Sequence, residues 1–373
     1  MEQSFNPSRL VVARARRALF QVELAERCDV SAHTVAAWES GAQAPNEMNI
    51  TRIAAATGFP KAFFHRSELE PLTDGAASFR ARTKIPARQK QAALSSGAMA
   101  REFVEWLENR FELPSVDLPD LGAPELRSKP RLVAKLVRDE WMLGDKPIPN
   151  VIRLLESRGV LVFSLVRDVQ ELDAFSFWSK GRPIVFLNTM KSVERGRFDA
   201  AHELMHLLCH REKTDKKEEA EANEFAGSFL MPKADIYANV PRIPDLNTYL
   251  SMKHRWRVSL SSLVYRLHEL RLLSTWQYRV LMVELSKRGY LKSEPNPLVE
   301  RESSTVLAQV FASLAKRGVR VPDIAREIAW QREDLEELIF GLGATMLQVA
   351  GGKGQTKVSG RTSPRRNHLR LVR

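Results

Sequence analysis

The feature that most constrains this chain is the segment His202-Glu203-Leu204-Met205-His206, which lies within a helical pattern over residues 194–211. Residues four apart on a helix lie one above the other on the same face. His202 and His206 can therefore direct ring nitrogens toward one metal ion, while Glu203 is close enough to take a proton from a water on that metal. Zinc lowers the pKa of such a water to about 7. The segment predicts a hydrolytic Zn²⁺ site with Glu203 as general base.

A second helical stretch, residues 218–230, follows the motif and carries further carboxylates. Glu219 and Asn223 are four residues apart on it, so one of them can bind the metal while the other steadies a ligand. Two histidines, one glutamate and a water form an established hydrolytic zinc shell. The only cysteines, Cys28 and Cys209, have no paired spacing, which excludes a four-cysteine zinc module and a disulfide framework. The metal must therefore be held by histidine and carboxylate.

Short apolar runs before the motif indicate a small sheet. Residues 160–166, 174–178 and 183–188 are rich in β-branched and aromatic side chains, and residues 179–181 form a turn between the last two runs. The middle of the chain is therefore α+β, and both flanks are helical. We expect the last run to be an edge strand that takes the substrate as an added strand. Its residues are Pro183, Ile184, Val185, Phe186, Leu187 and Asn188.

Two separated segments around the metal motif resemble the signatures of ImmA/IrrE metallopeptidases. They are residues 197–206, which contain the motif, and residues 219–232, which end in Phe-Leu-Met-Pro. The resemblance covers roughly residues 130–275. It implies that Glu219 is the third zinc ligand of a zinc-dependent endopeptidase of narrow specificity, which leaves Asn223 as the residue that steadies a ligand. His210 continues the four-residue ladder, and we interpret it as a solvated or structural residue.

The first 64 residues show a different pattern, which resembles the Cro/repressor-type (XRE) helix-turn-helix. Two short helices share an apolar seam, and Ser31 can cap the second of them. In this fold the start of one helix and the first turns of the next face the major groove. The expected DNA contacts are Gln21, Ala32, His33, Thr34 and Ala37, with Arg14, Arg16 and Arg17 as phosphate contacts.

The net charge of +12 favours a polyanionic partner, although residues 351–373 alone hold seven Lys or Arg and no acid. The head is nearly charge-balanced, so we expect DNA binding to need a homodimer, or help from the basic stretch 80–90 and the tail. The N-terminus lacks the apolar core of a signal peptide, and no apolar run is long enough to span a membrane. These features indicate a cytoplasmic protein.

We therefore expect a multidomain protein with an all-α helix-turn-helix head, an α+β zincin-like metallopeptidase core with a small sheet, and a helical C-terminal region. The expected segments are residues 1–66 for the head, 67–128 for a linker and connecting helix, 129–275 for the metallopeptidase, 276–350 for the helical region and 351–373 for a basic disordered tail.

Two functions fit this organisation. In the first, a DNA-binding transcriptional regulator carries a site-specific zinc endopeptidase that cleaves a repressor or other regulatory protein in a stress or mobile-element response. In the second, the protein is a non-proteolytic repressor or antitoxin, and the metallopeptidase fold serves partner binding or sensing. The presence of Glu203 favours the first, because a metal held only for structure needs no base.

Overall fold

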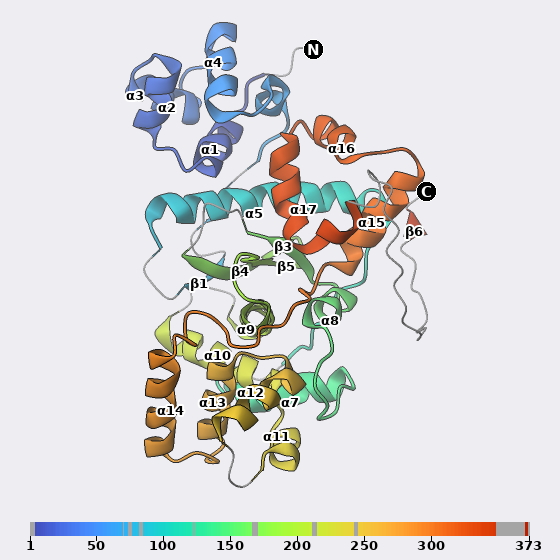
Figure 1. The fold of residues 1–373 in the computed structure, drawn as a ribbon. Helices are drawn as coiled ribbons and strands as arrows, with labels where there is room; N and C mark the ends of the chain where they lie inside the picture. Colours follow the sequence, from blue (N-terminus) through green and yellow to red (C-terminus); the bar gives the residue numbers. More distant parts are fainter. Residues whose placement is uncertain are drawn as a thin grey trace.

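The computed structural model describes residues 4–69, 71–73, 77–81, 85–121, 124–165, 171–210, 215–241, 245–347 and 370–371. From the N-terminus downward in Figure 1, it shows a helical head, a layer of helices, a small sheet and a second group of helices. Apart from residues 370–371, the predicted basic tail lies outside the described residues. None of the helices described is long and apolar enough to cross a membrane.

The head contains the predicted helix-turn-helix. Its helices are α1 (Pro7–Arg16), α2 (Gln21–Cys28), α3 (Ala32–Glu39) and α4 (Glu47–Thr57), followed by the 3₁₀ turn η1 (Lys61–His65). Asp29 ends α2 in the left-handed conformation with φ of 55°, the role that glycine often fills in such turns. Ser31 caps α3 as predicted, because its Oγ accepts a hydrogen bond from the backbone of Thr34.

The connector after the head was expected to hold a linker and one helix, but it also supplies two short strands. Its elements are β1 (Ser78–Ala81), α5 (Ala87–Glu108), β2 (Phe111–Glu112) and α6 (Pro124–Arg127). The helix α5 is the connecting helix expected within residues 67–128. The strand β1 was not predicted, because its four residues lie in a polar stretch that does not alternate between apolar and polar side chains over the length of a typical strand.

The sheet has four strands in the order β1-β4-β5-β3, with β3 at Leu161–Ser164, β4 at Leu172–Ser179 and β5 at Arg182–Leu187. β1 and β4, and likewise β4 and β5, run antiparallel, whereas β5 and β3 run parallel. Lys180 and Gly181 join β4 to β5 with φ of 47° and 80°, as a two-residue hairpin with two left-handed positions requires.

The prediction that residues 183–188 form an edge strand is wrong. β5 pairs with β4 on one side and with β3 on the other, so its backbone has no open side for a substrate strand. Its near-continuous apolar sequence reflects burial on both faces, because one face packs on α5 and the other on the metal-motif helix. Asn188 lies just beyond the strand, where its side chain donates to the backbone oxygen of Leu172.

Below the sheet in Figure 1, a group of helices encloses one of the two hydrophobic cores. The metal-motif helix α9 packs against β4 and β5, and α10 packs on α9 and α7. The helices of this group are α7 (Pro130–Glu140), α8 (Val151–Ser157), α9 (Val193–Cys209), α10 (Lys216–Leu230), α11 (Lys233–Asn239), α12 (Leu246–Trp256), α13 (Leu260–Glu269) and α14 (Thr275–Lys287).

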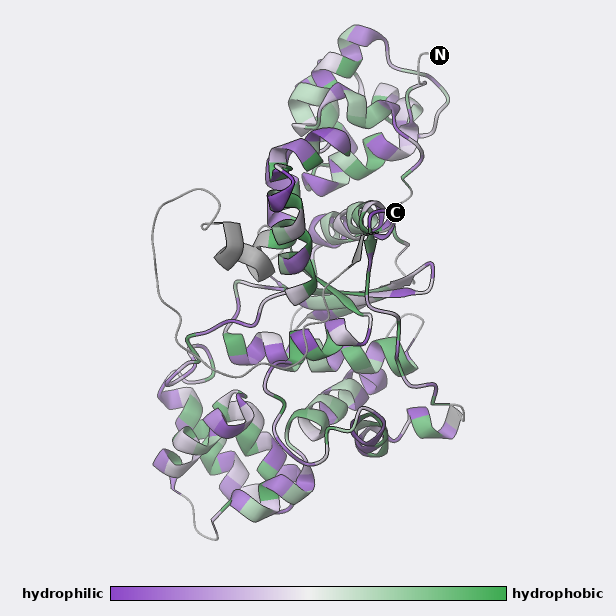
Figure 2. Cartoon of the chain, turned by 90° about the vertical axis from the view of Figure 1, so that its right-hand side faces the viewer, coloured by the Kyte–Doolittle hydropathy of each residue, from purple (hydrophilic) through white to green (hydrophobic). Residues whose placement is uncertain are grey.

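The second core lies above the sheet and joins the head to the C-terminal helices α15 (Thr305–Lys316), α16 (Val321–Glu327) and α17 (Arg332–Leu347). Viewed from the side in Figure 2, the hydrophobic strands lie between this layer and α9. Residues 276–350 are therefore divided, because α14 belongs to the lower core and α15–α17 to the upper one. The final short strand β6 (Arg370–Leu371) pairs with β2.

Candidate metal centre and DNA-binding head

The metal motif lies in the middle of α9, where the helix is buried against the sheet. Ser192 caps the helix by accepting a hydrogen bond from the backbone of Arg195. His202 and His206 are almost completely buried, at 0% and 2% exposed, and their Nε2 atoms are 3.0 Å apart. The spacing of four therefore brings the two imidazoles together, as the sequence predicted.

Glu219 completes the cluster from α10. Its carboxylate oxygens lie 3.4 Å from Nε2 of His202 and 3.3 Å from Nε2 of His206. Partial burial acts to raise the pKa of Glu219, but the hydrogen bonds with the two imidazoles outweigh it and hold that pKa well below its usual range. The three side chains offer one donor atom each within 4.8 Å of one another, so they can hold a metal ion.

Glu203 lies beside the cluster and is completely buried. Its Oε2 accepts a hydrogen bond of 2.6 Å from the hydroxyl of Ser176 on β4, and its Oε1 has no hydrogen-bond partner among the described residues. Burial raises the pKa of Glu203 well above its usual value, and the hydrogen bond from Ser176 works in the opposite direction. The carboxyl group is therefore held in place by one oxygen, and the other is available to accept a proton.

His210 has a structural role that its sequence position only suggested. It is buried, its Nδ1 lies 3.0 Å from Nδ1 of His206, and its Nε2 lies 3.2 Å from Glu221. The far nitrogen of His206 is thus engaged by a His210–Glu221 pair, an arrangement that fixes the orientation of a metal-binding imidazole. The solvated alternative is wrong. Cys209 packs in the core, and burial raises its pKa to about 12.

Asn223 does not contact the carboxylate of Glu219. Its side-chain amide donates to the backbone oxygen of Glu219 at 2.8 Å, and its Oδ1 accepts from Arg80 at 3.2 Å. The spacing of four favours this bond within the helix, since a short amide side chain readily reaches the carbonyl one turn before it. Asn223 therefore orients the turn that carries Glu219 rather than the ligand atoms themselves.

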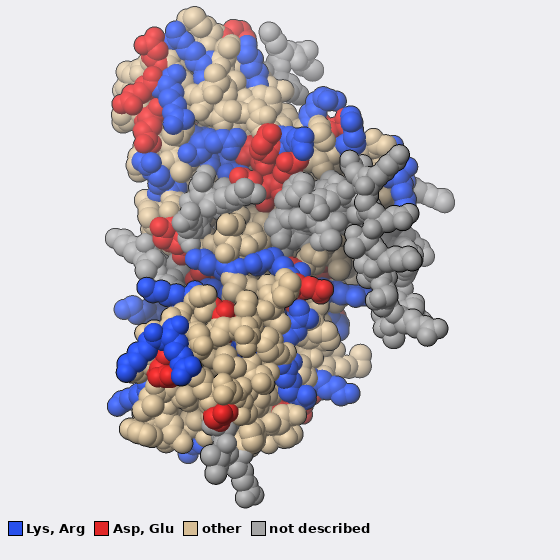
Figure 3. All heavy atoms as spheres, in the orientation of Figure 1, with Lys and Arg blue, Asp and Glu red and all other residues tan. Residues whose placement is uncertain are grey.

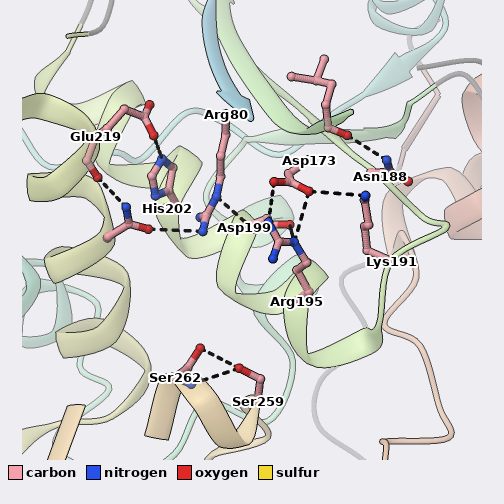
Figure 4. Close-up of polar contacts among 12 residues, drawn as sticks. Arg80, Asp173, Asn188, Lys191, Arg195, Asp199, His202, Glu219, Ser259 and Ser262 are labelled. Atoms are coloured by element: carbon pink, nitrogen blue, oxygen red, sulfur yellow. Dashed lines mark hydrogen bonds and ion pairs between the residues drawn. The ribbon is translucent and has the colours of Figure 1, made fainter. Parts of the chain in front are cut away.

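Arg80, like Ser176, is a residue at this site that sequence reasoning missed. It reaches down from β1, and Figure 4 shows its guanidinium between α9 and α10, close to His202. Its Nε lies 3.2 Å from Asp199, and the guanidinium lies 5.1 Å from the centre of the Phe198 ring. The basic stretch 80–90 was expected to help bind DNA, but Arg80 is only 13% exposed and faces the metal centre instead.

A cavity of about 760 Å³ opens next to these residues. Arg80, Asp199 and Asn223 form part of its wall, and the opposite side comes from α13, α14 and the segment after α14. Among the described residues, the cavity lining does not include the three metal-ligand candidates or Glu203. The cavity therefore approaches the metal centre on the side where Arg80 lies.

Comparison with protein families finds one match in the head and one in the middle of the chain. Residues 155–268 match the family described as an IrrE N-terminal-like domain, and residues 13–64 match the helix-turn-helix family. The chain is a fusion of these two domains. A search of curated proteins finds no match. The IrrE-like match contains α9 and α10 with the whole metal cluster, whereas β1 and Arg80 lie in the connector between the two matched segments.

The helix-turn-helix domain presents α3 at the left edge of the head in Figure 1, beside α2. His33 is exposed, and Ala32, Thr34 and Ala37 are partly exposed, so these predicted base contacts remain accessible to DNA. Gln21 is partly buried, and its side-chain amide donates to Glu39 at 2.7 Å. This bond uses one of the two amide N–H groups of Gln21.

The arginines predicted to contact phosphate are engaged within the protein. Arg14 pairs with Glu39 at 2.5 Å, and both Arg16 and Arg17 pair with Asp334 of α17, at 3.0 and 2.6 Å. Acidic and basic side chains accordingly lie side by side where the head meets the rest of the protein (Figure 3). Arg16 and Arg17 therefore stabilise the joint between the head and α17, whereas Arg14 pairs within the head, and contact of these arginines with phosphate stays a prediction.

Proposed function

We propose that this protein is a DNA-binding transcriptional regulator with a zinc-dependent endopeptidase of narrow specificity, which cleaves a repressor or other regulatory protein. The observation that carries the proposal is the convergence of His202, His206 and Glu219 at one point, with a buried carboxyl group, Glu203, next to it. The helix-turn-helix domain would bring this peptidase to a double-stranded DNA operator, where we expect it to act as a homodimer.

The donor set fits zinc. Nε2 of His202 and Nε2 of His206 are 3.0 Å apart, and each lies within 3.4 Å of a different carboxylate oxygen of Glu219, so the three side chains would hold a zinc ion between them. Two imidazoles and one carboxylate also suit zinc better than magnesium or calcium, which prefer oxygen ligands. Three protein ligands leave a fourth position for water or substrate, as in catalytic zinc sites.

When bound, zinc would supply Lewis-acid chemistry to the scissile carbonyl and lower the pKa of the attacking water. The protein's own contribution is the proton transfer. Oε1 of Glu203 would accept the proton of the attacking water and then deliver it to the leaving amine. Burial, by raising the pKa of Glu203, favours a carboxyl group that can hold the proton between these two steps. Ser176 orients the carboxyl through its other oxygen.

The substrate would bind as an extended segment along the sheet. β4 carries Ser176, the residue that touches Glu203, so the outer edge of β4 is the side of the sheet next to the base. An added strand there would hold its backbone in register through main-chain hydrogen bonds. Such binding requires a locally extended or unfolded substrate, which accounts for narrow specificity.

One observation favours the alternative, a non-proteolytic repressor or antitoxin. The edge of β4 is covered by β1, and Arg80 lies beside His202. In this conformation, therefore, a substrate strand cannot pair with β4. Under the alternative, the metal centre would bind or sense a partner without cutting it.

The two functions separate in a comparison of new protein N-termini in cells that carry the wild type or Glu203→Gln, before and after DNA damage. The substitution removes the base but keeps the shape and the metal ligands. A matched control is Glu224→Gln, which alters a carboxylate of α10 that pairs with Arg131 at the surface. A cleavage present with the wild type and the control, but absent with Glu203→Gln, establishes the peptidase and names its substrate. No difference among the three, with DNA binding intact, overturns the proposal in favour of the alternative.

A further inference from the structure

The strand β1 occupies the position on the sheet that a substrate strand would need. It runs antiparallel to β4, with Ser78 opposite Ser176, Phe79 opposite Phe175 and Arg80 opposite Ala174. Ser176 is the residue that donates to Glu203. The connector between the two family-matched segments thus places four of its own residues against the strand that borders the base.

The side chains of β1 alternate between the two faces of the sheet, as in any strand. Phe79 packs on Phe175, with their ring centres 5.3 Å apart, and belongs to the upper core. Arg80 points the other way, toward the metal centre. The aromatic side chain of Phe79 therefore fills a position in the upper core, and the basic side chain of Arg80 fills a position beside the metal centre on the opposite face of the sheet.

The place filled by Arg80 has the chemistry of a binding site for a basic side chain. Asp199, only 1% exposed, lies 3.2 Å from the guanidinium, Asn223 accepts a hydrogen bond from it, and the ring of Phe198 lies beneath it. A buried carboxylate, an amide oxygen and an aromatic face together recognise guanidinium or ammonium groups. All three residues belong to α9 or α10, the helices that hold the metal-ligand candidates.

The cavity leads to the same place. Its wall contains Arg80, Asp199 and Asn223, whereas the metal-ligand candidates and Glu203 are absent from its described lining. A peptide that entered from the cavity would therefore meet Arg80 before it reached the metal centre.

We propose that β1 is an internal occupant of the substrate site, and that the site accepts an extended segment with an arginine or lysine in the subsite formed by Asp199, Asn223 and Phe198. A substrate gains access when its own strand displaces β1. This inference rests on the proposed peptidase function and adds to it the substrate class and the contact that keeps the site closed.

The test measures peptide binding to the full chain carrying Glu203→Gln, so that cleavage does not consume the probe. The probes are two fluorescent peptides, Ala-Ser-Phe-Arg-Ala and Ala-Ser-Phe-Ala-Ala, followed by anisotropy. Adding Arg80→Ala should increase affinity for the arginine peptide about tenfold or more. The substitution removes the side chain that occupies the subsite, so the arginine of the peptide can form the charged hydrogen bonds there. The alanine peptide should bind more weakly than the arginine peptide.

Three further variants sharpen the result. Arg80→Lys keeps the charge and should leave binding weak, and the matched control Arg88→Ala, a surface arginine of the same connector that pairs with Glu23, should also leave it weak. Phe79→Ala loosens β1 through its other face and should increase peptide binding even if Arg80→Ala fails to fold. Asp199→Asn, combined with either opening variant, should remove the preference for arginine.

Equal binding by the parent, Arg80→Ala and Phe79→Ala would overturn the inference, as would an opened site without preference for the arginine peptide. Because binding is measured without the base, this failure differs from failure of the proposed function. In that second case the peptides bind as expected, but no cleavage depends on Glu203 in cells.

Discussion

The metal centre and the joint between the head and α17 both gather charged or ionisable side chains, but they do so in opposite ways. In the metal centre, His202, His206 and Glu219 direct three electron-pair donors at a common point. In the joint, Arg16 and Arg17 each meet a carboxylate oxygen of Asp334. Three electron-pair donors that face one point indicate a binding site for a cation. In contrast, oppositely charged side chains that pair with one another already neutralise each other's charge. The first arrangement is a site, and the second is a structural connection.

The largest effect should follow removal of a metal ligand. Glu219→Ala or His206→Ala should lower zinc affinity by about a hundredfold or more, because each would supply one of three protein ligands. Competition with a chromophoric chelator measures this affinity. Glu224→Gln on the same helix is the control and should leave the affinity unchanged. Equal affinity in all these variants would show that the converging donors are not a metal site.

The joint should respond through stability. Asp334→Ala leaves the buried guanidinium of Arg16 with Glu337 as its carboxylate partner and removes the Asp334 carboxylate from Arg17, so the free energy of unfolding should fall by about 3 kcal/mol. Unfolding of the full chain by denaturant, followed by a probe in the upper core, measures this free energy. Glu284→Ala, which breaks the surface pair with Arg288, is the control and should have little effect. If both substitutions have the same small effect, the joint is not a structural connection.

A smaller effect is expected at the outer support of the metal centre. His210→Ala removes the partner of Nδ1 of His206, so zinc affinity should fall about tenfold through poorer orientation of that imidazole. The same chelator competition applies, with His268→Ala, on α13, as the control. A loss as large as that of His206→Ala would instead make His210 a ligand.

The smallest effect tests the arginines directly. Arg17→Ala should leave the salt dependence of binding to nonspecific duplex DNA unchanged, because its guanidinium faces Asp334 and the backbone of Thr57. A phosphate contact would instead contribute about one unit to the slope of log affinity against log salt. A slope reduced by about one in Arg17→Ala would mean that the joint opens when the head binds DNA.

What could be predicted from the sequence was local. The spacing of His202 and His206 defines their shared face on one helix, and the helix-turn-helix and the β4–β5 hairpin likewise depend on neighbouring residues, whereas Glu219 was implied by the resemblance to ImmA/IrrE metallopeptidases. These predictions are confirmed by the positions of the elements. His210 was visible as a further step of the same four-residue ladder, but its burial depends on α10, which supplies Glu221.

What the sequence could not reveal depends on distant partners. The partner of Arg17 is 317 residues away along the chain, so an arginine near a DNA-binding motif looked like a phosphate contact. β1 becomes a strand only by pairing with β4, and its polar sequence resembles a linker. The same pairing puts Arg80 at the metal centre and covers the outer edge of β4.

The most direct test of the central claim is the anomalous diffraction of crystals of the full chain, recorded on both sides of the zinc absorption edge. The account predicts one peak per chain, bonded to Nε2 of His202, Nε2 of His206 and the carboxylate of Glu219. A peak elsewhere, for example at Cys209 or His210, or no peak from protein purified with added zinc, would contradict it.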